Sequence, residues 1–277
     1  MKELQFYIQR FAYYGTSGND QYTNNSSNTY VYGGGGNDYF WNYGSYVSVD
    51  AGIGEDTIDN RGNYSTVIAG DGNDYIHSDP YHSSTSTNNG INSKLYGGNG
   101  NDTIQNFANG VSMYGGNDND SLYNYRYGVA GTTTIYGGER VLMDGGEGND
   151  YIYSGGRSTG GGTVTVMGGT GNDTIEFASN SRNNTIIYYY GDGSDIVKNY
   201  NSTDTIDLRY NYYTRETLGS NVILNIEGSG KISLVGAKSQ TINIINGTVG
   251  GVGKYIDNPN SSTVITGTAY NDTIYNS

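Results

Sequence analysis

The chain has 277 residues with a formal net charge of −13, and it contains 45 Gly, 30 Tyr, 2 Pro and no Cys. Without Cys the fold has no disulfides, and the acidic balance argues against nucleic-acid phosphates as partners. No apolar run approaches the length of a membrane-spanning helix.

The first predicted element is residues 1–14, an alternating strand with Leu4, Phe6 and Ile8 on one face. This stretch lacks the uninterrupted apolar region of a secretory signal. We expect it to form a capping strand or a strand that pairs with another subunit.

Residues 15–200 are built around a glycine-rich hexapeptide that ends in Asp, as in 33–38, 97–102 and 168–173. The recurring 18-residue spacing between these aspartates predicts a solenoid of stacked coils. Glycines allow several backbone carbonyl oxygens to turn to one side, where the Asp adds a carboxylate. Such a set of oxygens favours Ca²⁺ over Zn²⁺, since the chain has no Cys and only His77 and His82, which we interpret as surface residues.

The pattern GGxGNDxI resembles the nonapeptide repeat of RTX (hemolysin-type) calcium-binding proteins. The resemblance implies a parallel β-roll in which several Ca²⁺ ions lie between the Asp turns of neighbouring coils, bound by turn carbonyls and Asp side chains. Four turns depart from the pattern, at Gly15-Thr16, Ala51-Gly52, Asp118 and Ser194. Carried over residue by residue, the resemblance implies that the metal ligands are Asp20, Asp38, Asp56, Asp74, Asp102, Asp120, Asp150, Asp173 and Asp195.

The opposite edge of each coil has different chemistry, because the Gly-Asp turn recurs every 18 residues and not every nine. Two interpretations of its polar residues stay open: stacked amides that form a hydrogen-bond ladder, or residues that only tolerate turn backbone. Four residues after the turn Asp the chain carries Asn42, Asn60, Asn106 and Asn124, with Ser78 and Ser154 as substitutes.

Two apolar columns at fixed coil positions predict one narrow core. The first column, two residues after each Asp, comprises Phe40, Ile58, Ile76, Ile104, Leu122, Ile152 and Ile175. The second, seven residues before each Asp, comprises Val31, Val49, Val67, Leu95, Met113, Met143 and Val166.

Two intervals in the repeat exceed 18 residues by ten or more, by 10 between Asp74 and Asp102 and by 12 between Asp120 and Asp150. We expect these inserts to lie on the Asn edge. The segment Gly156-Arg157-Ser158-Thr159-Gly160 fits G-x-S-x-G, but it leads into a strand and not a helix, so we interpret it as a chance match.

Residues 201–256 are predicted to form a β-rich capping region with strands at 221–226, 231–234 and 241–244. Residues 257–277 restart the motif with Asp272, a further candidate metal ligand. Either the chain is cut from a longer array, or this last coil docks head to tail on the first coil of another copy.

The sequence therefore predicts an all-β protein, a right-handed parallel β-roll (β-solenoid) with 18-residue coils and a small C-terminal β cap. Because the core is thin and glycine is abundant, we expect calcium binding to be coupled to folding. The predicted function is that of a calcium-stabilised secreted or cell-surface structural or adhesive module, and not of an enzyme. The alternative is a calcium-dependent carbohydrate-binding module that accompanies a polysaccharide-active enzyme, with a glycan contacting the Tyr-rich segment 123–127.

Overall fold

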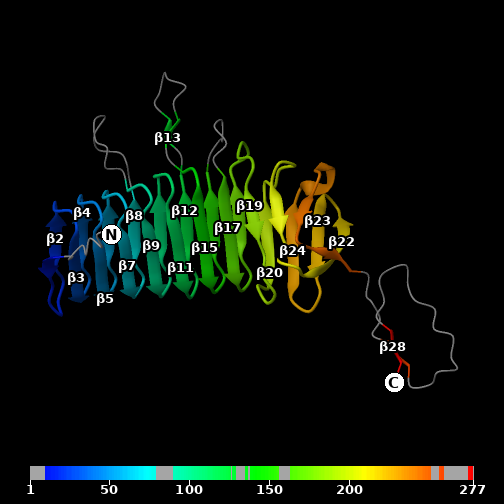
Figure 1. The fold of residues 1–277 in the computed structure, drawn as a ribbon, viewed down its shortest axis with the longest axis horizontal. Helices are drawn as coiled ribbons and strands as arrows, with labels where there is room; N and C mark the ends of the chain where they lie inside the picture. The colour runs from blue at the N-terminus through cyan, green and yellow to red at the C-terminus, as the bar shows by residue number, and fades with distance from the viewer. Residues whose placement is uncertain are drawn as a thin grey trace, which may run out of the picture.

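The computed structural model describes residues 10–78, 90–125, 127–128, 135–136, 138–155, 163–250, 256–258 and 274–276. Two long β-sheets run along the molecule, and successive strands of the chain alternate between them (Figure 1). From the N-terminal end as far as β21 (Thr205–Asp207) in one sheet and β20 (Ser194–Lys198) in the other, neighbouring strands within each sheet pair in parallel. Their registers include Val31↔Val49 and Phe40↔Ile58. This alternation confirms the predicted all-β parallel β-roll.

The first sheet contains the strands that lead into the Gly-Asp turns. In spatial order it comprises β1 (Arg10–Tyr14), β3 (Thr29–Gly35), β5 (Ser48–Ile53), β7 (Thr66–Asp71), β9 (Lys94–Asn99), β11 (Ser112–Asn117), β15 (Val141–Glu147), β17 (Val164–Thr170), β19 (Thr185–Ile187), β21 (Thr205–Asp207) and β25 (Asn243–Ile245).

The second sheet contains the strands that follow the turns. In spatial order it comprises β2 (Gln21–Asn24), β4 (Tyr39–Asn42), β6 (Thr57–Asn60), β8 (Tyr75–Ser78), β10 (Thr103–Asn106), β12 (Ser121–Asn124), β16 (Tyr151–Ser154), β18 (Thr174–Phe177), β20 (Ser194–Lys198), β24 (Gly230–Val235), β23 (Asn221–Ile226), β22 (Tyr212–Leu218) and β26 (Thr248–Val249).

The core lies between the two sheets and consists of the two predicted columns. Every one of the 14 side chains in them is at most 1% exposed. Burial alternates along each strand, as in the buried and half-buried residues of β10, because successive side chains of a strand point to opposite faces. The prediction of one narrow continuous core is confirmed.

Both inserts leave the roll at the edge opposite the Gly-Asp turns. The first insert follows β8 directly. The described chain resumes at Gly90, whose N–H donates to the carbonyl of Arg61 at 3.1 Å. The other follows β12, and its described part contains the antiparallel pair β13 (Tyr127–Gly128) and β14 (Ile135–Tyr136). The placement of the inserts on the Asn edge is therefore confirmed at their described ends.

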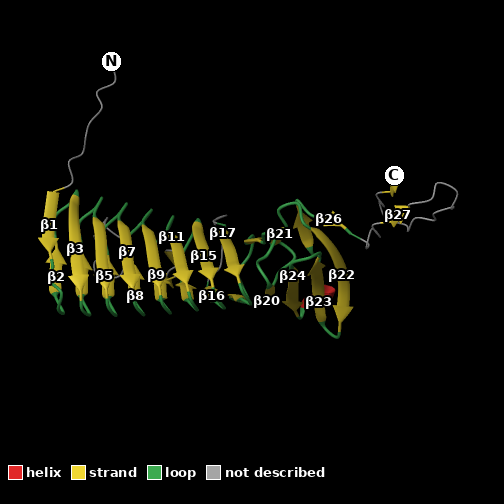
Figure 2. Cartoon of the chain, turned by 90° about the horizontal axis from the view of Figure 1, so that it is seen from below, coloured by secondary structure: helices red, strands yellow, loops and turns green. Residues whose placement is uncertain are grey.

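The C-terminal end of the roll differs from the predicted set of three cap strands. β23 and β24 match 221–226 and 231–234, and β22 extends them into an antiparallel meander that continues the second sheet through β20 (Figure 2). The third predicted strand, 241–244, was misplaced by two residues, because β25 covers Asn243–Ile245 and pairs with β21 in the first sheet. A short 3₁₀ helix spans Ala237–Ser239.

Two further strands, β27 (Ile256–Asn258) and β28 (Ile274–Asn276), pair in parallel with each other. The rest of 257–277, including Asp272, and residues 1–9 lie outside the described residues. Across the described part of the chain, no helix is both long enough and apolar enough to span a membrane.

Candidate metal sites

The nine turn aspartates lie in one continuous column along a single edge of the roll. Each backbone N–H, from Asp20 to Asp173, donates to Oδ1 of the aspartate in the next coil, over distances between 2.7 and 3.1 Å. The spacing of 18 residues predicted a shared edge, and these bonds hold successive carboxylates in the same orientation. Oδ1 of every aspartate after Asp20 therefore accepts a backbone hydrogen bond.

The turn backbone requires glycine at two positions. Gly34 and Gly36 have φ of 107° and 97°, in the left-handed region that side chains rarely adopt. A Cβ on either residue would also collide with the backbone of the preceding coil, at Thr16 and Gly18. Glycine at these positions therefore lets successive turns stack closely.

The other carboxylate oxygen points into the turn. Oδ2 is buried and has no hydrogen-bond partner among the described residues in seven aspartates: Asp38, Asp56, Asp74, Asp102, Asp120, Asp150 and Asp173. Buried carboxylate oxygens are normally paired, and an unpaired one carries a large desolvation cost. These seven atoms therefore indicate that a cation is the missing partner.

The first glycine of a turn lets oxygen atoms of two coils approach its Cα closely. A Cβ on Gly97 would lie within 2.5 Å of both Asp102 Oδ2 and the carbonyl oxygen of Gly115 in the next coil. Gly115 has the same relation to Asp120 and Gly145. Carboxylate and carbonyl oxygens from two coils thus lie close together beside the first glycine, and they are the kind of donors that Ca²⁺ prefers. These residues fit the metal that the sequence implies.

The electrostatics of the column agree with a missing positive charge. Burial is the largest cause that raises the pKa of Asp102 to about 7 and that of Asp120 to about 8, and neighbouring aspartates raise both further. The backbone N–H bond at Oδ1 partly opposes this rise. A bound cation would stabilise the charged form of the same carboxyls.

Asp20 differs from the other members, because Thr16 replaces the second glycine of its turn. The Thr16 N–H and Oγ1 both donate to Asp20 Oδ2, at 2.7 and 3.0 Å. The backbone bond from Thr16 is the main reason that the pKa of Asp20 is lowered. Its second oxygen therefore has partners, unlike those of the seven buried aspartates.

The remaining departures are local. Asp118 takes the left-handed backbone of the glycine it replaces, with φ of 76°, and its Oδ2 accepts from the Gly100 N–H at 3.2 Å. Ser194 still donates its N–H to the preceding turn, at Asn172 Oδ1. Ala69 stands at the first glycine position like Ala51, a departure that the sequence patterns missed.

A second ladder, which the sequence patterns also missed, runs beside the aspartates through the residue before each of them. Here the backbone N–H of one coil donates to the Asn Oδ1 of the preceding coil, as from Asn37 to Asn19 at 2.9 Å and from Asn119 to Asn101 at 3.0 Å. The direction is opposite to that of the aspartate ladder. The available signal was the Asn that precedes seven of the nine turn aspartates; Glu55 and Ser194 precede the other two.

The opposite edge of the roll is held by buried side-chain amides. Asn24 Nδ2 donates to Asn42 Oδ1 at 2.9 Å, Asn42 to Asn60 at 2.8 Å, and Asn106 to Asn124 at 3.0 Å. Asn124 continues to Ser154 Oγ at 3.5 Å. Of the two interpretations of these residues, the hydrogen-bond ladder is confirmed.

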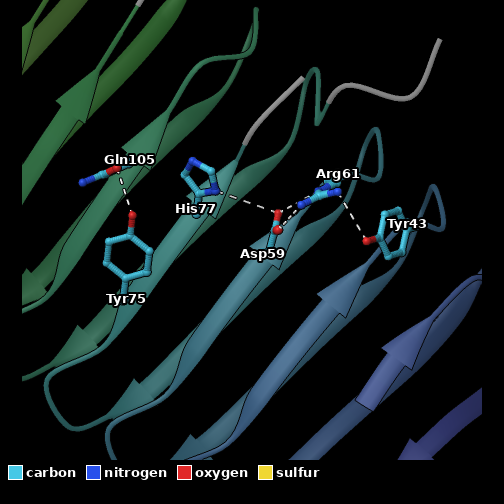
Figure 3. A network of polar contacts seen from close by, with 6 residues as sticks. All are labelled: Tyr43, Asp59, Arg61, Tyr75, His77 and Gln105. Carbon is cyan, nitrogen blue, oxygen red and sulfur yellow. Dashed lines mark hydrogen bonds and ion pairs between the residues drawn. The ribbon is translucent and has the colours of Figure 1, made fainter. Parts of the chain in front are cut away.

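The outer face of the second sheet carries aromatic and polar side chains. Asp59 forms an ion pair with Arg61 at 2.6 Å, and His77 Nδ1 lies 3.9 Å from Asp59 Oδ1 (Figure 3). Arg61 also reaches the hydroxyl of Tyr43, and Tyr75 donates to Gln105 at 2.9 Å.

Only some residues of the Tyr-rich segment 123–127 lie on this face. Tyr123 and Tyr125 stack with ring centroids 5.8 Å apart, whereas Asn124 points inward to the amide ladder. Arg126, the Tyr127 side chain, His82 and the G-x-S-x-G serine Ser158 lie outside the described residues. Among the described residues, His77 lies near one carboxylate, that of Asp59, and belongs to no group of three or more possible metal ligands.

Side chains alone do not complete a metal site. In the part of the chain that the structure describes, no three or more His, Cys, Asp or Glu side chains form a group able to hold a metal ion. The turn aspartates instead lie close to backbone carbonyls of the next coil, as Asp102 does to the Gly115 carbonyl beside Gly97.

A comparison with family models gives the same answer as the geometry. The model for the RTX calcium-binding nonapeptide repeat (4 copies) matches residues 92–105, 158–177 and 260–275. No curated protein matches the chain. These segments are therefore similar to RTX calcium-binding nonapeptide repeats, and repeats of this kind bind Ca²⁺ ions at multiple sites.

Proposed function

We propose that the chain is a calcium-stabilised structural or adhesive module that acts outside the cell or at its surface. The observation that carries the proposal is the column of seven buried Oδ2 atoms without a partner among the described residues. The nine turn aspartates are the proposed ligands, with Asp272 as a tenth. Their charge opposes folding until a cation enters, so the metal is proposed to act as part of the architecture.

Two general properties of the family support the location and the lack of catalysis. RTX repeat proteins are typically extracellular, and RTX repeats are typically non-catalytic. Calcium sites of the extracellular class bind weakly, in the range of about 10⁻⁴–10⁻³ M, so they are filled where free calcium is high. Carboxylates that bind calcium in this way are poorly suited to act as general acids or bases.

Circular dichroism in chelator and in excess calcium tests the proposal. We expect strand content to rise strongly on calcium addition, with Mg²⁺ as a control, because Mg²⁺ demands a stricter octahedral site. Equal strand content in chelator and in excess calcium would contradict the proposal.

The finer part of the proposal is that copies of the module stack head to tail and extend the roll. Parallel sheets end in strands whose outer N–H and C=O groups are available to another chain. A heterologous contact of this kind propagates into a filament if it does not close.

Carbohydrate binding is a second candidate function, favoured by the aromatic outer face of the second sheet. Tyr39 and Trp41 have ring centroids 4.0 Å apart, and Phe107 stacks on Tyr125 at 4.9 Å. Polar groups such as Gln105 lie on the same face. Aromatic rings with nearby hydrogen-bonding groups suit the apolar face and hydroxyls of a sugar.

A glycan array probed in calcium distinguishes the two candidates. Carbohydrate binding predicts calcium-dependent hits that Tyr123→Ala removes. The control is Tyr114→Ala, which changes the outer face of the first sheet, where Tyr114 stacks on Tyr96. The absence of any hit would leave the structural module as the function.

A further inference from the structure

We propose that β28 of one copy pairs in parallel with β2 of a second copy, so that the second sheet runs through the junction. The inference rests on the head-to-tail assembly proposed above, and it names the two strand edges and their register.

The register of β27 and β28 matches that of the roll. Ile256 pairs with Ile274 and Asn258 with Asn276, an offset of 18 residues. β4 and β6 pair in the same way, with Phe40 opposite Ile58 and Asn42 opposite Asn60. β27 and β28 therefore repeat the residue order of the second sheet, with an apolar residue and then Asn two positions later.

This pair forms a sheet of its own among the described strands. Each of its two strands thus has one edge without a described partner. An edge that repeats the register of the roll is suited to pair with another strand of the same type.

β2 provides such an edge at the opposite end of the chain, because it is the terminal strand of the second sheet. The carbonyls of Asp20 and Asn24 accept from Tyr39 and Tyr43 of the neighbouring coil. Since alternate residues of a parallel strand direct their backbone groups to opposite sides, Gln21 and Thr23 direct theirs to the outer edge. Both side chains are exposed.

The amide ladder also stops at β2. Asn42 Oδ1 accepts from Asn24 Nδ2 and from the Gly44 N–H. Asn24 Oδ1 accepts from the Ser26 N–H, and among the described residues no preceding coil supplies an amide donor. A strand that ends in Asn, docked in the register of the roll, would supply that donor.

Docking in this register places Ile274 opposite Tyr22 and Asn276 opposite Asn24. Asp272 precedes Ile274 by two residues, as Asp20 precedes Tyr22. In sequence, the junction thus repeats the Asp spacing of the roll, and we expect the contact to form in calcium.

The length of the chain excludes docking of β28 on β2 of the same copy. Nine strand spacings separate β2 from β24 in the sheet order, or about 43 Å at ~4.8 Å each. The Gly250 N–H donates to the Tyr213 carbonyl of β22, a strand that lies beyond β24 in the sheet order. The six residue steps from Gly250 to Ile256 span at most about 20 Å. β28 therefore cannot reach β2 of its own copy, and the proposed partner is β2 of a second copy.

Disulfide trapping between single-cysteine variants tests the register, since the natural chain has no Cys. Thr23→Cys mixed with Tyr275→Cys in calcium is expected to give a covalent dimer, because these residues face each other on adjacent strands. Thr23→Cys mixed with Asp257→Cys is the control. β27 lies one strand further away, at about 9.6 Å, beyond disulfide reach.

A pair of proline variants tests the edge in the uncrosslinked protein. Thr23→Pro removes a donor from the outer edge of β2. Thr217→Pro is the matched control, because Thr217 is an exposed Thr whose N–H faces the outer edge of β22. The Glu227 N–H donates to the Tyr212 carbonyl, so every second residue of β22 from Tyr212 onward bonds to β23. Thr217 is one of the residues in between. By sedimentation velocity in calcium, we expect loss of assembly with Thr23→Pro and wild-type assembly with Thr217→Pro.

Circular dichroism of each sample separates this inference from the proposed function. A chain that gains strand content in calcium but sediments as a strict monomer overturns the inference and leaves the calcium-stabilised module intact. Trapping of Tyr275→Cys by Thr217→Cys, and not by Thr23→Cys, would also overturn it, since that pair reports docking on the C-terminal edge.

Discussion

Each turn aspartate has two tasks, one for each carboxylate oxygen. Oδ1 accepts the N–H of the preceding aspartate, as Asp56 does from Asp38 at 2.7 Å, while Oδ2 faces the space between turns. The same side chain therefore fixes the stacking of coils and provides the charge that a cation must balance. Removing one aspartate affects both neighbouring junctions.

We predict that Asp56→Ala lowers the number of bound calcium ions by more than one, measured by calorimetric titration. The reason is that Asp56 borders the turns of both Asp38 and Asp74. Asp59→Ala is the control, since Asp59 lies on the outer face, paired with Arg61, and its loss should leave the calcium count unchanged. A loss confined to one ion would contradict shared ligation.

The sequence located the nine aspartates because their spacing is regular, but it could not reveal how each carboxylate is oriented. That orientation depends on hydrogen bonds to a neighbouring coil, which no local pattern encodes. Ala69 was missed for a similar reason, because an alanine is unremarkable until the space beside the first glycine is known.

At the level of elements, the amide ladder joins coils without charge. Asn42 is 1% exposed, donates to Asn60 and Gly44, and accepts from Asn24. We predict that Asn42→Ala lowers the free energy of unfolding by about 1–3 kcal/mol in excess calcium, because buried partners are left unsatisfied.

Urea unfolding followed by circular dichroism measures this change, and calorimetry should report the wild-type calcium count. Asn25→Ala is the control, because Asn25 is exposed and its loss should change stability little. An unchanged unfolding free energy in Asn42→Ala would show that the ladder contributes nothing to stability.

The strands of the C-terminal meander were only partly predictable. β23 has three consecutive buried apolar residues and was recognised, whereas β22 has mostly exposed residues and no apolar alternation. Its strand conformation comes from pairing with β23, a tertiary contact. For the same reason, the assignment of β25 to the first sheet could not be read from its own residues.

At the scale of the whole molecule, the buried carboxyls link folding to pH. Burial, the main cause, raises the pKa of Asp56 and Asp173 to about 7 and that of Asp195 to about 8, above the ordinary value of 3.8. A raised pKa in the folded state means that the protonated carboxyl favours folding. This contribution is complete below pH 3.8 and is lost as pH rises through about 7 to 8.

We therefore predict that, in chelator, strand content measured by circular dichroism increases as pH falls from about 8 to about 5. In excess calcium the dependence should reverse, because protons compete with the metal for the same carboxylates. Strand content in chelator that stays constant or increases with pH would contradict the proposed protonation of the column.

The opposed directions of the aspartate and Asn ladders at the turn edge make most junctions between coils chemically alike. A coil that follows the pattern gives one backbone donor forward, to an Asp, and one backward, to an Asn, as Asn101 and Asp102 do. A complete 18-residue unit that carries this Asn and Asp, inserted between two such coils or removed from between them, leaves the donors at the junction with acceptors. The roll can thus change its length in whole coils while the chemistry of its junctions stays constant.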